Sequence, residues 1–145
     1  MTTSPRRGFV IDTSAAVAVI LGEAGSDEIV ACLEAATVRL LSTASRVELG
    51  IVIEARLWPR GQDVVERFLR DAKIELVAVE ADLAERAMRA WRRYGKGHHP
   101  AGLNFGDCFT YALAEQAGLP ILCTSNDFLE TDAAVERPKR RAADT

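Results

Sequence analysis

Short apolar runs alternate with longer amphipathic segments along this chain. The run Phe9-Val10-Ile11 is apolar and rich in β-branched side chains, which is typical of a strand buried on both faces of a sheet. Runs of this kind predict strands at residues 9–11, 38–42, 74–79 and 120–123, and Val135 indicates a fifth strand at an edge.

The segments between these runs have the signals of helices. Asp12, Thr13 and Ser14 precede an apolar segment and can cap its first turn, and Ser26 is placed to cap the next helix. The periodicity predicts helices over residues 15–21, 26–36, 44–57, 62–72, 80–94 and 104–117. In the fifth of these, one apolar face is formed by Leu83, Ala87, Ala90 and Trp91.

Alternation of strands and helices is typical of a parallel sheet with helices on both sides. We therefore predict a three-layer α/β/α sandwich with a mainly parallel sheet of four or five strands. No internal repeat or linker divides the chain, so we expect residues 8–135 to form one domain. Residues 1–7 are predicted to be a flexible N-terminus, and residues 136–145 a basic, flexible C-terminal tail.

The composition is that of a globular protein, with 145 residues of which 48% are hydrophobic and 27% charged. No apolar run approaches the roughly 20 residues that a membrane-spanning helix needs, and the N-terminal segment lacks the apolar stretch of a signal peptide. The cysteines, Cys32, Cys108 and Cys123, are widely spaced and form no metal-binding motif. We expect reduced thiols in a cytoplasmic protein.

The formal net charge is −3, which argues against a protein that binds nucleic acid through general basicity. It does not exclude a site in which acidic residues are concentrated, because bound cations would reverse the local sign of the charge.

Two aspartates follow predicted strands. Asp12 comes directly after the strand at residues 9–11, and Asp127 lies four residues beyond the strand that ends at Cys123. In an open α/β sheet, ligands bind at the carboxyl ends of the strands. If these two strands are neighbours, both carboxylates lie at one site.

Two further acids lie on predicted helices in apolar surroundings. Glu48 shares a face with small and apolar residues: Ala44, Ile51, Val52 and Ala55. Asp107 begins a helix in which Thr110 is the one strongly polar residue among positions 108–114. A carboxylate that faces the interior is costly unless it is paired or binds a cation. Four such acids together would form an oxygen-rich pocket that suits Mg²⁺ or Mn²⁺.

Each acid has a simpler interpretation when it is taken alone. Asp12 can be a helix N-cap, and Asp107 can occupy the third helical position with Asn104 as the cap. Glu48 can rotate to the surface, and Asp127 can be an ordinary loop residue. The metal-site hypothesis depends on their joint placement.

The sequence resembles the PIN-domain ribonuclease toxins of the VapC type. The resemblance covers about residues 8–135, and its most specific parts are Phe-Val-Ile-Asp-Thr-Ser-Ala at 9–15 and Leu-Asn-Phe-Gly-Asp at 103–107. Glu48, the run Ser-Asn-Asp-Phe at 125–128 and Thr131-Asp132 match as well. Ser125 departs from the family, in which glycine is frequent at this position.

The resemblance implies a toxin of a type II toxin–antitoxin system that cleaves RNA with Mg²⁺ or Mn²⁺. By position, Asp12, Glu48, Asp107 and Asp127 match the family's acids, with Asp12 and Asp107 on the principal ion. Thr13 and Asn126 would hydrogen-bond to the metal-binding carboxylates without contacting the ion themselves. The resemblance also implies a homodimer and a hetero-oligomer with a VapB-type antitoxin, which inserts a segment near the active site.

Contacts to RNA are predicted from basic and aromatic residues ahead of the Asp107 helix. Arg92, Arg93 and Lys96 lie close to Trp91 and to the pair His98-His99. The alternative is a solvated helix face with Trp91 in the core. Arg137 and the basic residues after it are further candidates for phosphate contacts.

Rival classes of protein fit less well. A receiver domain would need a second acid beside the first and a lysine after a late strand, and a haloacid-dehalogenase-type phosphatase would need an acid at position 14, which is Ser14. The remaining alternative is a catalytically weak PIN module that acts by RNA binding or complex formation.

Overall fold

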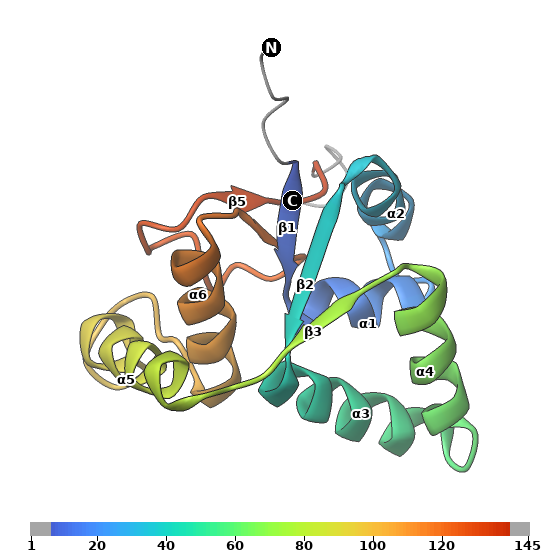
Figure 1. Ribbon diagram of the computed structural model, residues 1–145, viewed down its shortest axis with the longest axis horizontal. Helices are drawn as coiled ribbons and strands as arrows, with labels where there is room; N and C mark the ends of the chain where they lie inside the picture. The colour runs from blue at the N-terminus through green and yellow to red at the C-terminus, as the bar shows by residue number, and fades with distance from the viewer. Residues whose placement is uncertain (1–6, 140–145) are drawn as a thin grey trace.

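A parallel sheet of five strands forms the centre of the computed structural model, which describes residues 7–139 (Figure 1). Its strands are β1 (Gly8–Ile11), β2 (Val38–Ser42), β3 (Glu75–Val77), β4 (Ile121–Leu122) and β5 (Val135–Glu136). Its helices are α1 (Thr13–Leu21), α2 (Ser26–Ala35), α3 (Thr43–Leu57), α4 (Gly61–Asp71), α5 (Ala81–Tyr94) and α6 (Phe105–Ala117). The strand order is β3-β2-β1-β4-β5, and every neighbouring pair is parallel.

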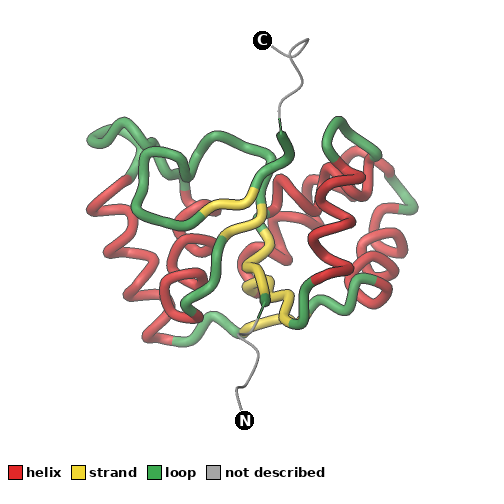
Figure 2. Tube along the Cα trace, turned by 90° about the horizontal axis from the view of Figure 1, so that it is seen from above, coloured by secondary structure: helices red, strands yellow, loops and turns green. Residues whose placement is uncertain are grey.

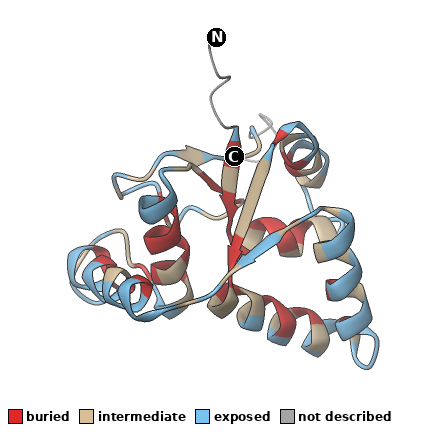
Figure 3. Cartoon of the chain, in the orientation of Figure 1, coloured by how far each residue is buried: buried red, intermediate tan, exposed pale blue. Residues whose placement is uncertain are grey.

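Helices cover both faces of the sheet, with α5 and α6 on one side and α1 to α4 on the other (Figure 2). Successive residues of a strand point to opposite faces, so Val10 and Ile121 pack against α5 and α6. Ile11 and Leu122 pack against the other group. Buried residues therefore gather on β1, on β4, at the carboxyl end of β2 and on the helix faces turned toward the sheet (Figure 3). The predicted sandwich and its parallel sheet are confirmed.

The edge strand β3 is shorter than predicted. We expected a strand over residues 74–79, but only Glu75–Val77 pair with β2. The reason is that β2 ends at Ser42, which caps α3 and leaves no strand for residues 78 and 79 to pair with. Val79 instead donates its backbone N–H to the Thr43 hydroxyl at 3.1 Å.

Two details of the helices differ from the prediction. Ser26 is the first residue of α2, and Gly25, with a φ of 87°, is its N-cap. Trp91 was placed on the apolar face of α5 but is 44% exposed, whereas Leu83, Ala87 and Ala90 are buried. The buried stripe of α5 is thus narrower than the sequence indicated.

Helix α3 also exposes part of the face that we expected to be internal. Its buried positions include Ser45, Leu49 and Ile53, which are spaced four residues apart. Ile51 is 67% exposed and Ala55 is exposed, although both were predicted to share an inward face with Glu48.

The C-terminal segment is fixed at its beginning. We predicted a flexible tail from Glu136, but Glu136 belongs to β5 and the N–H of Lys139 donates to Glu28 at 2.8 Å. At the other end, the carbonyl of Arg7 accepts from the N–H of Thr37 at 2.7 Å. Residues 1–6 and 140–145 of the two predicted flexible ends lie outside the described residues.

Strand β1 lies between β2 and β4 in the sheet. The strands that follow β1 in the chain are added first on one side of it (β2, β3) and then on the other (β4, β5), so the strand order reverses at β1. Such a switch point is where α/β sheets bind ligands. The segments that follow the carboxyl ends of β1, β2 and β4 carry Asp12, Glu48 and Asp127, whereas Asp107 lies in the first turn of α6, the helix that precedes β4. None of the helices in residues 7–139 is long and apolar enough to cross a lipid bilayer.

Candidate active site

Asp12 occupies the junction between β1 and α1. It is the N-cap of α1, and its Oδ2 accepts hydrogen bonds from the N–H of Ser14 at 3.1 Å and from the Ser14 hydroxyl at 2.6 Å. The residue is only 5% exposed. Burial raises the pKa of this carboxyl, although the hydrogen bonds from Ser14 act in the opposite direction.

Asp107 lies in the first turn of α6 and forms a capping box with Asn104. Its backbone N–H donates to Asn104 Oδ1 at 2.9 Å, and its Oδ2 accepts from the N–H of Asn104 at 3.1 Å. Burial, with the charges of Asp12, Asp127 and Glu48, raises the pKa of Asp107 to about 7, against the lowering effect of the Asn104 bond. Asp107 is both a capping residue and a member of a carboxylate cluster.

Glu48 reaches the site from α3 and is held there by two neighbours. The Thr13 hydroxyl donates to Glu48 Oε1 at 2.5 Å, as expected for a residue that supports a ligand. The carboxylate also lies against Gly106, where an added Cβ would be 2.3 Å from Glu48 Oε2. A residue without a side chain is therefore needed at position 106 for this carboxylate to occupy its place.

Asp127 lies in the β4–β5 loop, residues 123–134, and is half-buried. The start of the loop is tied to α1, because the N–H of Thr124 donates to the Ser14 hydroxyl at 3.0 Å. Asn126 is exposed, and its Oδ1 accepts from Arg137 Nη2 at 2.6 Å. Asn126 was predicted to support a ligand, and in the structure its carbonyl is engaged by Arg137.

The four predicted carboxylates are thus brought to one site. None of the ion pairs formed within residues 7–139 involves any of them. A concentration of buried negative charge without a protein cation fits a bound metal ion. No three Asp, Glu, His or Cys side chains of the described chain converge closely enough to enclose an ion. Carboxylate oxygens are the donors that a hard cation such as Mg²⁺ takes, one or two at a time together with several waters.

Buried hydroxyl groups lie beside the carboxylates. Ser42 Oγ donates to Ser45 Oγ at 3.1 Å, and Ser45 Oγ is 3.4 Å from the hydroxyl of Thr110. After burial, which raises the pKa of Asp12, and the bonds from Ser14, which lower it, the Thr110 hydroxyl lowers it further. The sequence contained a signal for this arrangement in Thr110, an isolated polar residue in an apolar helix, but it was not recognised. Ser14 and Gly106 were missed as well.

The basic residues predicted to contact RNA differ in whether their side chains are already paired. Arg93 is already engaged, since its Nη1 is 3.3 Å from Asp132 Oδ2. Arg92 is exposed, and Lys96 lies beside Trp91 at an apolar hollow next to Phe105. The two histidines do not form a metal pair, because His98 Nε2 is 2.9 Å from the Arg92 carbonyl and His99 Nδ1 accepts from the N–H of Ala101.

The cysteines are free thiols and are not activated. Burial raises the pKa of Cys108 to about 11 and that of Cys123 to about 12, so neither is a thiolate near neutral pH. Cys108, which is buried next to Asp107, therefore packs in the core and is not activated as a nucleophile.

Two hollows lie at different places on the molecule. One, of about 640 Å³, is lined by polar residues that include Asp127, Asn126 and Arg137. The other, of about 710 Å³, lies between α1, α2 and α4 and is lined in part by Val19, Leu33 and Phe68. The first contains one of the four carboxylates, Asp127, and the second is a separate, mainly apolar groove.

Comparison with known proteins gives the family of this chain. The PIN domain model matches residues 9–133. Ribonuclease VapC30 of Mycobacterium tuberculosis is 49% identical over 126 residues, which cover 87% of this chain and 96% of the relative. Ribonuclease VapC of Mycolicibacterium smegmatis is 47% identical over 126 residues, covering 87% of this chain and 98% of the relative.

Solved structures agree with the fold. The crystal structure of VapC20 from Mycobacterium tuberculosis, described as a sarcin–ricin loop cleaving toxin, has a TM-score of 0.72 at 20% identity and covers 90% of this chain and 99% of that one. The DNA-bound VapBC of Salmonella typhimurium has a TM-score of 0.71 at 19% identity, with 90% and 97% covered. By its match to the domain model and its identity to these ribonucleases, the chain belongs to the PIN-domain family, among the VapC ribonucleases.

Proposed function

We propose that this protein is the toxin of a type II toxin–antitoxin pair and an endoribonuclease that hydrolyses RNA phosphodiester bonds with a divalent metal ion. The observation that carries the proposal is the cluster of Asp12, Glu48, Asp107 and Asp127 at the switch point of the sheet, with no protein cation paired to it among the described residues. The ribonuclease names of its relatives support the same activity.

The proposed ion is Mg²⁺ or Mn²⁺, with Asp12 and Asp107 as its principal ligands. Such an ion would neutralise charge on the phosphoryl oxygens and lower the pKa of a bound water. Glu48 and Asp127 would orient waters or hold a second ion.

The protein's own contribution is to fix the carboxylates before an ion arrives. Ser14 holds Oδ2 of Asp12, Asn104 holds Oδ2 of Asp107, and the Thr13 hydroxyl holds Oε1 of Glu48. Hydrogen bonds of this kind restrict ligand rotation and leave the other carboxylate oxygen of each residue for the ion or its waters.

RNA would approach over the polar hollow beside Asp127. Arg137 lines this hollow, so its guanidinium is placed to meet a phosphate next to the one that is cleaved. Arg92 and Lys96 stay predictions as further contacts, and Arg93 would have to leave Asp132 in order to serve.

A catalytically weak PIN module that acts only by binding is the alternative. The simultaneous presence of four acids and of the groups that hold them favours an active enzyme, since a binding module has no need for uncompensated carboxylates in its interior.

The proposed partners are a VapB-type antitoxin and a second copy of this chain, in a cytoplasmic complex. The apolar groove between α1, α2 and α4 suits an apolar segment of the antitoxin. Large apolar side chains are exposed at Val47 and Ile51 of α3 and at Phe105 of α6, and such surfaces often mark interfaces. The three free thiols fit a reducing compartment.

The mass of the protein in solution tests the partner proposal. We expect light scattering to give twice the mass of the chain alone, and a larger complex after co-expression with the small protein encoded beside it. A monomer that does not bind the neighbouring protein would contradict the proposal.

Loss of a principal ligand should abolish cleavage. We expect Asp12→Ala and Asp107→Asn each to reduce RNA cleavage by more than about 100-fold, because loss of an outer-shell partner alone typically costs about 10–100-fold. A chelator should stop the wild-type reaction, and added Mn²⁺ should restore it. Gel analysis of purified RNA substrates measures the loss.

Asp71→Asn is the matched control, since Asp71 is an exposed carboxylate on α4 that forms an ion pair with Arg70. It should cleave RNA at the wild-type rate. Near-normal, metal-dependent cleavage by either site variant would contradict the ligand assignment, and cleavage by none of the proteins would favour the binding module.

The metal-free protein should become less stable as the pH rises toward 8. The pKa of Asp107 is about 7 in the folded protein against a reference value of 3.8, so between these values the folded state holds a proton that the unfolded chain has released. The free energy of unfolding therefore falls as the pH rises through this range. We expect a melting temperature about 3–5 °C lower at pH 8 than at pH 6.

Calorimetry of wild type and Asp107→Asn in chelator gives this difference, and most of it should disappear in the variant. Mg²⁺ should raise the melting temperature of the wild type more at pH 8 than at pH 6. An unchanged pH dependence in the variant would show that other groups cause it.

Gly106→Ala should impair catalysis with little effect on folding. The new methyl group would meet the end of the Glu48 side chain, which is flexible and can move aside, but Glu48 would then leave Thr13. We expect a 10–100-fold loss of cleavage, of about the size found for lost outer-shell contacts, and a nearly unchanged melting temperature. Gly50→Ala is the control, because its methyl group would meet the flexible Arg46 side chain outside the site. Equal activity of the two variants would contradict the proposed role of Gly106.

A further inference from the structure

The β4–β5 loop carries Asp127 but has no helix or strand between residues 123 and 134 that would hold it in place. Its position depends on side-chain contacts. At its start, Thr124 is bonded to Ser14, and in its middle Phe128 is fully buried. Asn126, next to Asp127, accepts from Arg137. A further attachment, near the end of the loop, is Asp132, which has no role in the proposed reaction.

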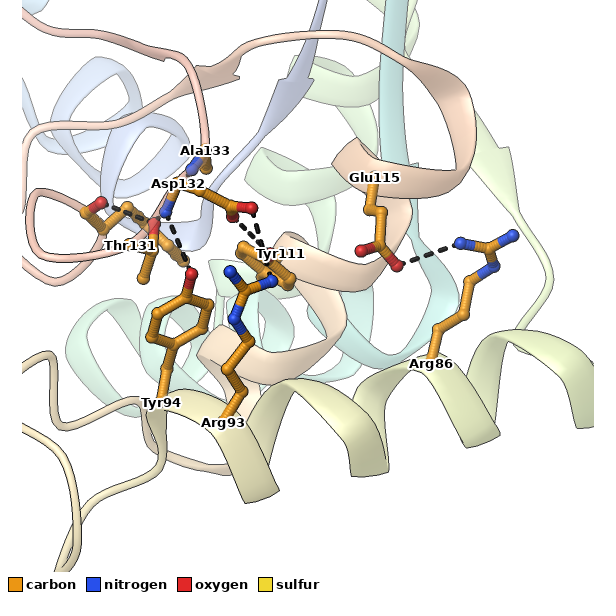
Figure 4. A network of polar contacts seen from close by, with 9 residues as sticks. Arg86, Arg93, Tyr94, Tyr111, Glu115, Thr131, Asp132 and Ala133 are labelled. Carbon is orange, nitrogen blue, oxygen red and sulfur yellow. Dashed lines mark hydrogen bonds and ion pairs between the residues drawn. The ribbon is translucent and has the colours of Figure 1, made fainter.

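Asp132 is contacted from two helices by three residues (Figure 4). The Tyr111 hydroxyl of α6 donates to Asp132 Oδ1 at 2.5 Å, and Arg93 Nη1 of α5 lies 3.3 Å from Oδ2. The N–H of Asp132 donates to the Tyr94 hydroxyl at 3.3 Å. The hydrogen bond from Tyr111, with the charge of Arg93, lowers the pKa of Asp132, so this carboxylate is ionised at neutral pH.

Tyr111 connects this contact to the active site through α6. It lies four residues after Asp107, so the two side chains lie one turn apart on the same side of the helix. Tyr111 is buried, and its ring packs edge-on against Tyr94 with the centroids 5.5 Å apart. The helix that carries Asp107 thus also holds the end of the loop that carries Asp127.

Hydrogen bonds of the Thr131 side chain join the residues of the loop between Phe128 and Ala133. The Thr131 hydroxyl donates to the carbonyl of Phe128 at 2.7 Å and accepts from the N–H of Ala133 at 3.2 Å. Phe128 packs in the same cluster as Tyr94 and Tyr111. A displacement at Asp132 would therefore be passed to Phe128, which is the neighbour of Asp127 in the chain.

We propose that Asp132 and Tyr111 are a pair of positioning residues that hold Asp127 beside Asp107 through their hydrogen bond. The inference rests on the proposed function, in which Asp127 contributes to the metal site. Neither residue touches the ion or the RNA. A purely structural clamp is the alternative, and it would contribute to stability without changing the affinity for metal.

Tyr111→Phe tests the pair, because it removes one hydroxyl and keeps the buried ring. The probe is Mn²⁺ alone, titrated into the protein without RNA and followed by electron paramagnetic resonance. We expect the dissociation constant for Mn²⁺ to rise about 10-fold, at the lower end of the range for groups that support metal ligands. Amide hydrogen exchange of residues 126–132 in the metal-free protein should become faster. Asp132→Asn, which weakens the same bond from the other side, should give the same two changes.

Glu115→Gln is the matched control. It breaks the ion pair between Arg86 Nη1 and Glu115 Oε1, 2.9 Å apart, which joins the same two helices without contacting the loop (Figure 4). It should alter neither the Mn²⁺ affinity nor the exchange of the loop. If Tyr111→Phe lowers the melting temperature but binds Mn²⁺ like the control, the proposal is overturned.

Asp127→Asn separates this proposal from the function on which it rests. If Tyr111 acts through Asp127, Tyr111→Phe will not weaken Mn²⁺ binding further when Asp127 is already changed. If Asp127→Asn weakens binding but Tyr111→Phe does not, only the positioning role fails. Unchanged binding in Asp127→Asn itself would overturn both the metal role of Asp127 and the positioning role.

Discussion

The cost of burying several carboxylates close together is the constraint around which the rest of this structure is arranged. Asp12 and Asp107 are 5% and 7% exposed, and burial, followed by the charges of Asp12, Asp127 and Glu48, raises the pKa of Asp107. The fold offsets part of this cost locally. Asp12 caps α1 and Asp107 lies in the first turn of α6, where the positive end of a helix dipole favours negative charge. The proposed cation would compensate the remainder of the charge.

Local signals made the sheet and two of the acids predictable from the sequence. Each strand was a short apolar run, and Asp12 and Asp107 stand at helix starts, which a few neighbouring residues define. Glu48 was placed on the right helix but with the wrong neighbours, since Ile51 is exposed. Helix α3 has more apolar positions than its buried face can hold, so periodicity alone did not determine which of them are internal.

The contacts that complete the site join residues far apart in the sequence, and no local pattern could reveal them. Thr13 and Glu48 are separated by 35 positions, and Ser14 and Thr124 by 110. The extent of β3 likewise depends on where its partner β2 ends. Pairings of this kind follow from the strand order, which brings β1 between β2 and β4, and the order was not predicted from the sequence.

The capping and metal-site interpretations of Asp107, which were alternatives in the sequence, are compatible in the structure. The capping box occupies Oδ2 through the N–H of Asn104. That bond fixes the rotamer of the Asp107 side chain. It occupies only one of the carboxylate's acceptor positions, because an ionised carboxylate can accept about four hydrogen bonds. Helix capping therefore prepares this residue for a cation, because it sets the direction of the carboxylate before an ion binds. Since the same bond begins α6, binding of an ion at Asp107 would stabilise the native helix along with the site.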